Sequence, residues 1–265
     1  MLPFALSIAV LSLVQAALVA APRAASSPLL ERLASSWWAL ALPLPIAVVV
    51  AAISLDPSAA HLLTYLALIA VPPLAAVALA SLARGGRPPL ALLVIPLFAL
   101  AWAFRGALAG QTAALALSAL ACLSLGWLLA CVVADRWLKL GIYAMAAIDT
   151  WLIASDLLQE PNATLNAVAP LAGLPRLQYV SFGSAAMGFG DLFIAAVLGA
   201  MLAQNRRLQL TGAALTAIFA LSFDLLFFAV DSLPATVPIA LTLAALEIAG
   251  RRSRGPNRER PPSPA

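Results

Sequence analysis

Residues 112–133 read TAALALSALACLSLGWLLACVV, a run without a single charged side chain. At ~1.5 Å per residue, a helix over this run is about 33 Å long, enough to cross the ~30 Å hydrocarbon core of a bilayer. Similar Ala- and Leu-rich runs recur along all 265 residues, of which 63% are hydrophobic and 10% are charged. Soluble domains carry roughly 25% charged residues. The composition therefore excludes a water-soluble globule and predicts an all-α membrane protein.

Charged residues and Pro- or Gly-rich breaks divide the chain into nine predicted transmembrane helices. Their ranges are 2–20, 37–55, 62–82, 89–104, 112–133, 140–158, 184–203, 209–230 and 233–249. We expect the first five in an N-terminal part, residues 1–139, and the last four in a second part, residues 140–249. The basic tail, residues 250–265, is rich in Arg, Pro and Ser and lacks apolar periodicity, so it is expected to be disordered in the cytoplasm.

The distribution of lysine and arginine orients these helices. With nine crossings the termini lie on opposite sides, so the basic residues of alternate loops can be compared. Thirteen of the 15 lie on one side, and the other side holds only Arg105 and Arg176. Because basic loops stay in the cytoplasm, the N-terminus is expected outside and the C-terminus inside. A cleaved signal peptide would invert this pattern, and the first apolar run lacks the basic residues that precede a signal core.

The remaining composition argues against several partners. The net charge is +4, but no basic stripe is interleaved with aromatic residues, so nucleic acid is not an expected partner. Cys122 and Cys131 share one apolar run and are expected to be packing residues. His61 has no second His or Cys nearby, so no metal site is expected. The sequence leaves the lipid bilayer as the predicted environment and implies no cofactor.

Two carboxylates, Asp149 and Asp191, stand inside predicted helices. A charge near the bilayer centre costs at least ~2.5–3.5 kcal/mol, so such a residue is by default a functional hypothesis. Counting ~1.5 Å per residue from the outer helix ends places Asp149 about 13 Å deep and Asp191 about 11 Å deep. Since consecutive antiparallel helices commonly pack together, we expect the two carboxylates to face each other.

Other acidic residues compete with this pair. Asp156 follows Asp149 by seven residues and lies on the same predicted face, near the interface, where water accounts for it. Asp224 and Asp231 are also seven residues apart on one predicted face. They either line a water-accessible path or are simply solvated towards the outer end of the eighth helix, and the sequence favours solvation.

Paired carboxylates in a low-dielectric site can perform acid and base chemistry. Both cannot ionise easily, so one keeps a proton while the other acts as a base on water attacking a peptide carbonyl. The protonated member then donates to the oxyanion or the departing amine. Gly188 is predicted to share the helix face of Asp191 and admit a neighbouring backbone, and Gly190 to loosen the helix. A small-residue packing face with Ser184 would also explain the glycines, but not the aspartate.

These residues resemble the presenilin and signal peptide peptidase family of intramembrane aspartyl proteases. Gly188-Phe189-Gly190-Asp191 resembles the GxGD signature in the seventh of nine helices, and Ile148-Asp149 is similar to the Tyr-Asp of the sixth. The start of the last predicted helix is similar to the family's Pro-Ala-Leu. The resemblance covers about residues 140–249, and the departures at Ile148 and Thr236 leave substrate preference open. It implies a presenilin-like fold, catalytic Asp149 and Asp191, and substrate contacts at Gly188, Phe189, Gly190, Pro234, Ala235 and Thr236.

The predicted orientation is similar to that of signal peptide peptidase and opposite to that of presenilin. The implied substrates are transmembrane helices with the N-terminus inside, such as signal-peptide remnants. One alternative is a prepilin peptidase, whose GxGD motif normally continues with a Lys two residues later, where Phe193 stands here. The other is a transporter that uses the two aspartates as a proton or cation relay. The sequence determines neither the oligomeric state nor any obligate subunit.

Overall fold

The computed structural model of the protein describes residues 3–24, 26–56, 58–157, 159–168, 170–228, 230 and 233–253. Its α-helices are α1 (Phe4–Ala20), α2 (Pro28–Glu31), α3 (Leu44–Leu55), α4 (Ala59–Val77), α5 (Val94–Ala103), α6 (Leu108–Val132), α7 (Asp135–Ala154), α8 (Gln159–Ala167), α9 (Phe189–Leu202), α10 (Arg206–Asp224) and α11 (Val237–Ser253). Shorter helical turns are η1 (Ser36–Ala41), η2 (Ala78–Leu82), η3 (Pro88–Leu93), η4 (Leu171–Gly173) and η5 (Leu225–Phe228). One hairpin joins β1 (Tyr179–Phe182) and β2 (Ala185–Gly188).

The helices are those of a membrane protein. Within the described part of the chain, four helical segments are long and apolar enough to cross a membrane, namely Ala59–Leu82, Leu108–Val132, Asp135–Ala154 and Arg206–Phe228. Shorter apolar helices cover Phe4–Ala20, Leu44–Leu55, Pro88–Ala103 and Phe189–Leu202. Large apolar side chains stay exposed along them: on α4, Leu62 is 71% exposed and Ile69 is 72% exposed. Such a surface suits contact with lipid and not with water.

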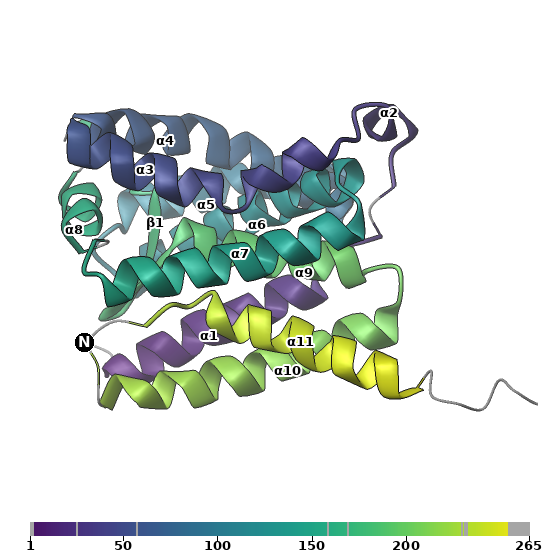
Figure 1. Ribbon diagram of the computed structural model, residues 1–265. Coiled ribbons are helices and arrows are strands. Elements are labelled where there is room, and N and C mark those ends of the chain that lie inside the picture. The colour runs from purple at the N-terminus through teal and green to yellow at the C-terminus, as the bar shows by residue number, and fades with distance from the viewer. Residues whose placement is uncertain are drawn as a thin grey trace, which may run out of the picture.

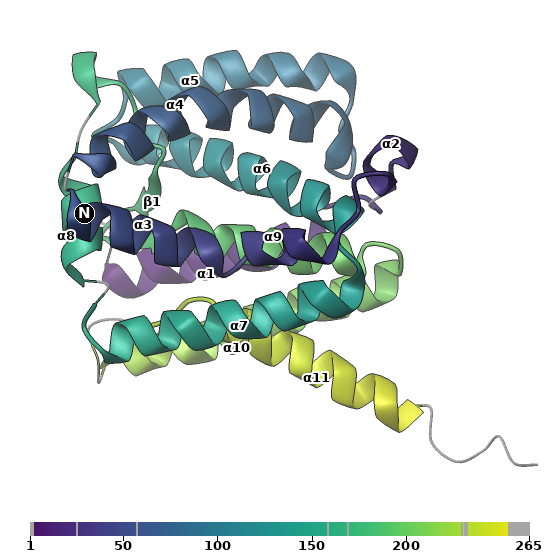
Figure 2. The same ribbon diagram turned by 45° about the horizontal axis from the view of Figure 1, so that its top comes forward.

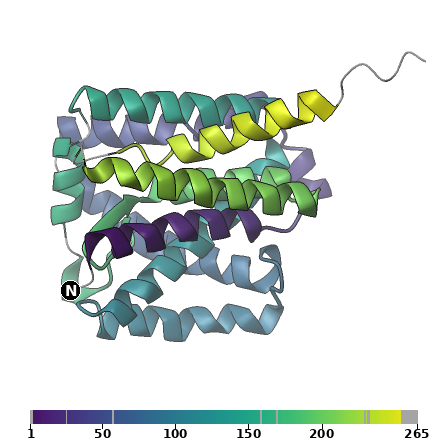
Figure 3. The same ribbon diagram turned by 90° about the horizontal axis from the view of Figure 1, so that it is seen from below.

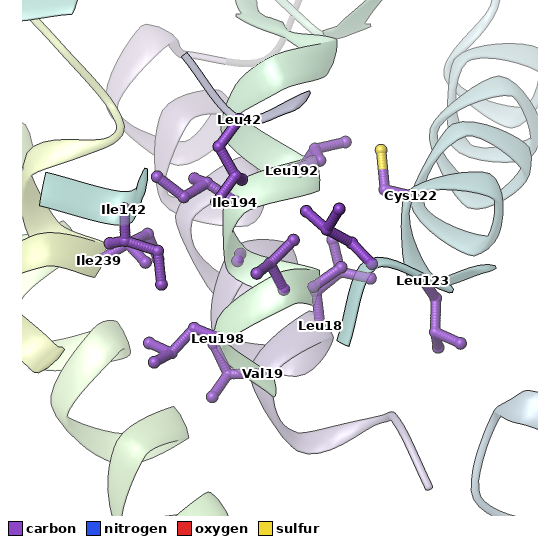
Figure 4. Close-up of a cluster of buried hydrophobic side chains, with 14 of the residues drawn as sticks. Leu18, Val19, Leu42, Cys122, Leu123, Ile142, Leu192, Ile194, Leu198 and Ile239 are labelled. Atoms are coloured by element: carbon purple, nitrogen blue, oxygen red, sulfur yellow. The ribbon is translucent and has the colours of Figure 1, made fainter. Parts of the chain in front are cut away.

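Helix α9 lies at the centre of the bundle, where it packs against α1, α6, α7, α10 and α11 (Figures 1 and 2). Leu192, Ile194 and Leu198 are fully buried, and Figure 4 shows them among apolar side chains from neighbouring helices. The crossing of α6 and α9 is close because a Cβ at Gly126 would lie 2.7 Å from the backbone carbonyl carbon of Ala196. Small residues allow this kind of backbone approach between membrane helices.

The other helices lie around this centre. Helices α4 and α5 pack on α6, and α10 and α11 lie on the opposite side of the bundle from α4 and α5 (Figure 2). Helix α1 packs against both α9 and α10, and the view from below shows it running beside α10 (Figure 3). The parts expected at residues 1–139 and 140–249 therefore interlock, since α1 and α6 from the first both contact α9 from the second.

The hairpin corrects the predicted start of the seventh helix. Residues 185–188, placed in a helix by the prediction, form β2, and the helix begins at Phe189. A short apolar run is compatible with either a strand or a helix, and antiparallel pairing with β1 makes this one a strand. Side chains from distant helices hold the turn: the Gly183 N–H donates to Gln111 Oε1 at 2.8 Å, and the Ser184 N–H donates to Ser7 Oγ at 3.2 Å.

Three other predicted helices, the sixth, the eighth and the last, also have wrong boundaries. The sixth helix, predicted at 140–158, runs from Asp135 to Ala154 and starts with an acidic residue, which favours a helix N-terminus. The eighth, predicted at 209–230, starts at Arg206, and its α-helical part ends at Asp224. Residues 250–253, predicted as disordered, belong to α11, whose last turn carries Arg251 and Arg252, and basic side chains stabilise a helix C-terminus. Asp231 and residues 254–265 lie outside the described residues.

Candidate active site

Asp149 lies on the buried face of α7, five residues before that helix ends at Ala154. Its side chain is 4% exposed. The Thr236 hydroxyl donates a hydrogen bond to Asp149 Oδ2 over 2.7 Å. Thr236 is itself fully buried and lies just before α11 begins at Val237. The carboxylate is therefore held by a segment 87 residues further along the chain.

Asp191 lies in the first turn of α9 and is half-buried. The Gly188 N–H donates to Asp191 Oδ2 over 3.1 Å, which joins the end of β2 to the start of the helix. Acidic side chains near a helix N-terminus are favourable because the unpaired N–H groups there carry partial positive charge. Gly188 was predicted to share a helix face with Asp191. It instead precedes the helix and acts through its N–H, because the hairpin occupies that part of the chain.

The two aspartates meet at one cavity. They are close enough to interact electrostatically, and both line a cavity of about 880 Å³. A Cβ on Gly190 would lie 3.0 Å from Met145 Cε, and Met145 is one turn before Asp149 on α7. The absence of a side chain at Gly190 thus lets the start of α9 pack closely against α7. The depths counted from residues 158 and 184 do not hold, since both helix ends are placed differently in the structure.

Asp156, the competing carboxylate of the sixth predicted helix, occupies a different environment. It follows the end of α7, has a positive φ of 58° and is exposed. The residues lining the cavity include Asp149 but, within the described chain, not Asp156. The end of α7 at Ala154 removes the shared helix face on which the two carboxylates were expected. Of the two, Asp149 is the one that lines the same cavity as Asp191.

Gln15 is a part of the site that the sequence analysis missed. It lies on α1, is 1% exposed and lines the cavity. Its Nε2 donates to the backbone carbonyl of Asp191 over 3.2 Å and to that of Ala235 over 3.1 Å. One amide therefore joins α1, the first turn of α9 and the segment before α11. The signal in the sequence was a lone amide within the apolar run Phe4–Ala20, since a buried polar group of this kind needs partners.

The predicted substrate-contact residues separate into two groups. Most line the cavity beside the aspartates, namely Gly188, Phe189, Gly190 and Ala235. Pro234 and Thr236 are buried and are not among the lining residues of the described chain. Thr236 contacts Asp149 instead, since its hydroxyl donates a hydrogen bond to that carboxylate. Cys122 is fully buried, and its Sγ donates to the Phe189 carbonyl at 3.6 Å, so it packs behind the start of α9.

Fold and site define a class, a helical membrane protein with paired aspartates at an apolar cavity. Comparison with protein-family models, with curated proteins and with solved structures gives no match to any of them. In the part of the chain that the structure describes, no group of three or more His, Cys, Asp or Glu side chains could hold a metal ion.

Proposed function

We propose that the protein is an intramembrane aspartyl endopeptidase of the signal peptide peptidase type. In this proposal Asp149 and Asp191 activate water to hydrolyse peptide bonds within transmembrane helices. The observation that carries it is the meeting of two interacting carboxylates at one largely apolar cavity inside a helical membrane protein. The resemblance of residues 188–191 to the GxGD signature supports the same reading.

The surroundings of the two carboxylates suit the sharing of one proton. Each accepts a hydrogen bond from a neutral donor, the Thr236 hydroxyl for Asp149 and the Gly188 N–H for Asp191. Like charges held close in a site with little water disfavour double ionisation, so the pair behaves as one acid and one base. The base takes a proton from the attacking water, and the acid donates to the oxyanion or the leaving amine.

The cavity is suited to an unwound apolar segment. A scissile bond inside a helix is shielded by the helix's own hydrogen bonds, so a substrate must unwind locally before water can attack. Met187 and Gly188, the last residues of β2, line the cavity beside the aspartates. Among the described residues β2 pairs with β1 alone, so its other edge offers backbone groups to an extended peptide, apart from the Gly188 N–H that donates to Asp191.

The proposal includes nine crossings in a presenilin-like arrangement with the C-terminus in the cytoplasm. In its support, arginines from three predicted cytoplasmic loops meet around Gln209. Arg84 and Arg206 both donate to Gln209 Oε1, at 2.9 Å and 2.8 Å, and burial together with Arg206 and Arg23 lowers the pKa of Arg84. The start of α1 and the end of α11 lie at opposite ends of the bundle (Figure 1).

The test is cleavage of a labelled transmembrane peptide by detergent-purified protein. We expect two peptide products whose masses place the cut within the apolar segment. Reconstituted protein should conduct no protons or cations in liposomes. Ion flux without peptide products would contradict the protease function and favour the transporter alternative.

The orientation has its own test, a reporter fused after Ala265. A reporter that is active only in the cytoplasm is expected to be active, because thirteen of the 15 basic residues lie on the side assigned to the cytoplasm. A second fusion after Gly173, in the outward loop, should be inactive with the same reporter. Activity in the reverse pattern would overturn the orientation and with it the expected direction of the substrate.

Replacing Thr236 with valine should lower kcat/KM by about tenfold or more. Valine keeps the shape but removes the donor to Asp149, and a hydrogen bond to a charged group contributes about 1.5–3 kcal/mol. Thr236→Ser keeps the hydroxyl and should retain most of the activity. Peptide-cleavage kinetics of both variants provide the measurement. Equal losses in the serine and valine variants would show that packing at this position matters and the hydrogen bond does not.

A further inference from the structure

A third carboxylate, Asp224, lines the same cavity as Asp149 and Asp191. It is the last residue of α10 and is half-buried. Ser12 on α1 donates a hydrogen bond to Asp224 Oδ2 over 2.8 Å, and Ser12 is 2% exposed. In the described chain this hydroxyl is the only hydrogen-bond donor to the carboxylate, which leaves Oδ1 for another partner. The mechanism proposed above makes no use of this group.

The position of Asp224 relative to the catalytic pair follows from α1. Ser12 contacts Asp224, and Gln15, three residues later on the same helix, contacts the backbone of Asp191. Three residues of helix correspond to a rise of about 4.5 Å. An extended peptide advances ~3.3 Å per residue, so a substrate side chain one or two residues from the scissile bond comes level with Asp224.

Among the described residues, no basic side chain balances the negative charge of Asp224 at this end of the cavity. The cavity-lining residues of the described chain include no Lys, Arg or His. The ion pair found among the described residues, Lys139 with Glu247, involves neither Asp224 nor its neighbours. A carboxylate in largely apolar surroundings gains from a cationic partner and disfavours an anionic one.

Aromatic rings complete the environment. Phe223 and Phe227 line the cavity near Asp224, and Phe227 packs edge-to-face on Phe4 with ring centroids 5.3 Å apart. The methylene stem of a lysine or arginine can lie along such rings while its charged end reaches the carboxylate. The rings also attract a cation through their negative faces.

We propose that Asp224 and Ser12 form a specificity subsite for a lysine or arginine side chain, one or two residues from the bond that is cleaved. This inference rests on the proposed protease function. It narrows the substrate class to membrane segments with a basic residue close to the cleavage site. Asp224 acts here on substrate choice, and the hydrolytic step stays with Asp149 and Asp191.

The experiment uses matched transmembrane peptides with lysine, norleucine or glutamate at single positions up to three residues on either side of the cleaved bond. With the purified wild type, kcat/KM for lysine should exceed that for norleucine by about tenfold at one or two neighbouring positions, and glutamate should be disfavoured there. The readout is the lysine-to-norleucine ratio within each variant, so a general loss of activity cancels. Asp224→Asn should bring this ratio close to one, and Asp224→Glu should preserve it.

A second measurement does not depend on an active Asp224 variant. In Asp191→Asn protein, which should bind but not cut, a carbodiimide is used to couple the peptide lysine to a carboxylate in contact with it. Mass spectrometry should find the bond at Asp224. A wild type that cuts the norleucine peptide without a lysine preference, a preference that survives Asp224→Asn, or coupling to another carboxylate would each overturn the subsite. Failure to cut any peptide would instead count against the protease function.

Discussion

Asparagine in place of Asp191 is expected to abolish peptide cleavage while the helix bundle stays folded. Asparagine keeps the shape of the side chain and an oxygen that accepts the Gly188 N–H, but it can neither share a proton nor act as a base. Asp149→Asn should behave alike, since its amide oxygen still accepts the Thr236 hydroxyl. Loss of one proton-transfer group typically costs about 10²–10⁴ in rate. The double variant should be no worse than either single one, because the carboxylates act as a unit.

The matched control is Asp156→Asn. Asp156 is exposed and lies beyond the end of α7, so this change should leave cleavage within about twofold of wild type, as expected for a surface substitution. Product formation is measured by mass spectrometry, and thermal unfolding reports whether each variant is folded. Undiminished cleavage by Asp149→Asn or Asp191→Asn would remove the pair from the mechanism. If Asp156→Asn abolished activity and Asp149→Asn did not, Asp156 and not Asp149 would be the catalytic partner of Asp191.

Gln15→Met is expected to lower kcat by roughly 10- to 100-fold, with a smaller change in KM. Methionine has a similar volume but cannot donate to the carbonyls of Asp191 and Ala235. Leaving a buried polar group unpaired costs about 1–3 kcal/mol, which loosens the first turn of α9 relative to the segment before α11. Asp191 would then be misplaced by a change on α1. Displacement of a reacting group by about 1 Å can cost 10²-fold in rate.

Ser118→Ala is the control for removing a buried polar group. Ser118 lies on α6 and its hydroxyl has no hydrogen-bond partner among the described residues, so its loss should change stability by less than about 0.5 kcal/mol and leave kcat unaltered. The informative quantity for Gln15→Met is kcat per folded molecule, with the folded fraction taken from thermal unfolding. A lower folded fraction with unchanged kcat would show that Gln15 supports the fold and does not position Asp191.

The accuracy of the structure predicted from the sequence differs from element to element. Helix α6 was predicted at 112–133 and is found at Leu108–Val132, because a long uncharged apolar run admits only one structure in a bilayer. The run at 185–188 is short, and its structure depends on pairing with residues 179–182, so hydropathy alone misassigned it. Helix α7 was placed about five residues late at its start and four at its end, since apolar residues beyond Ala154 continue the pattern after the helix has stopped.

For the two aspartates as well, some features could be predicted from the sequence and others could not. Asp149 and Asp191 were singled out because an ionisable side chain inside an apolar run is visible without knowledge of its neighbours. Their predicted depths relied on helix ends that the structure moves, yet the structure brings both to one cavity. Gly188 was predicted to be a small residue on a helix face. Because the helix begins one residue later, Gly188 instead ends strand β2 and its N–H donates to Asp191.

The sequence by itself determined that the protein is a helical membrane protein and that two of its carboxylates require a functional explanation. Both conclusions rest on hydropathy, which is a local property of the chain. Only the tertiary structure decided that Gln15 meets Asp191, that Thr236 meets Asp149 and that Ser12 meets Asp224. The members of these pairs are 176, 87 and 212 residues apart. Which polar groups meet depends on how the helices pack around α9. Hydropathy indicates that a buried polar group needs a hydrogen-bond partner, but it does not identify that partner.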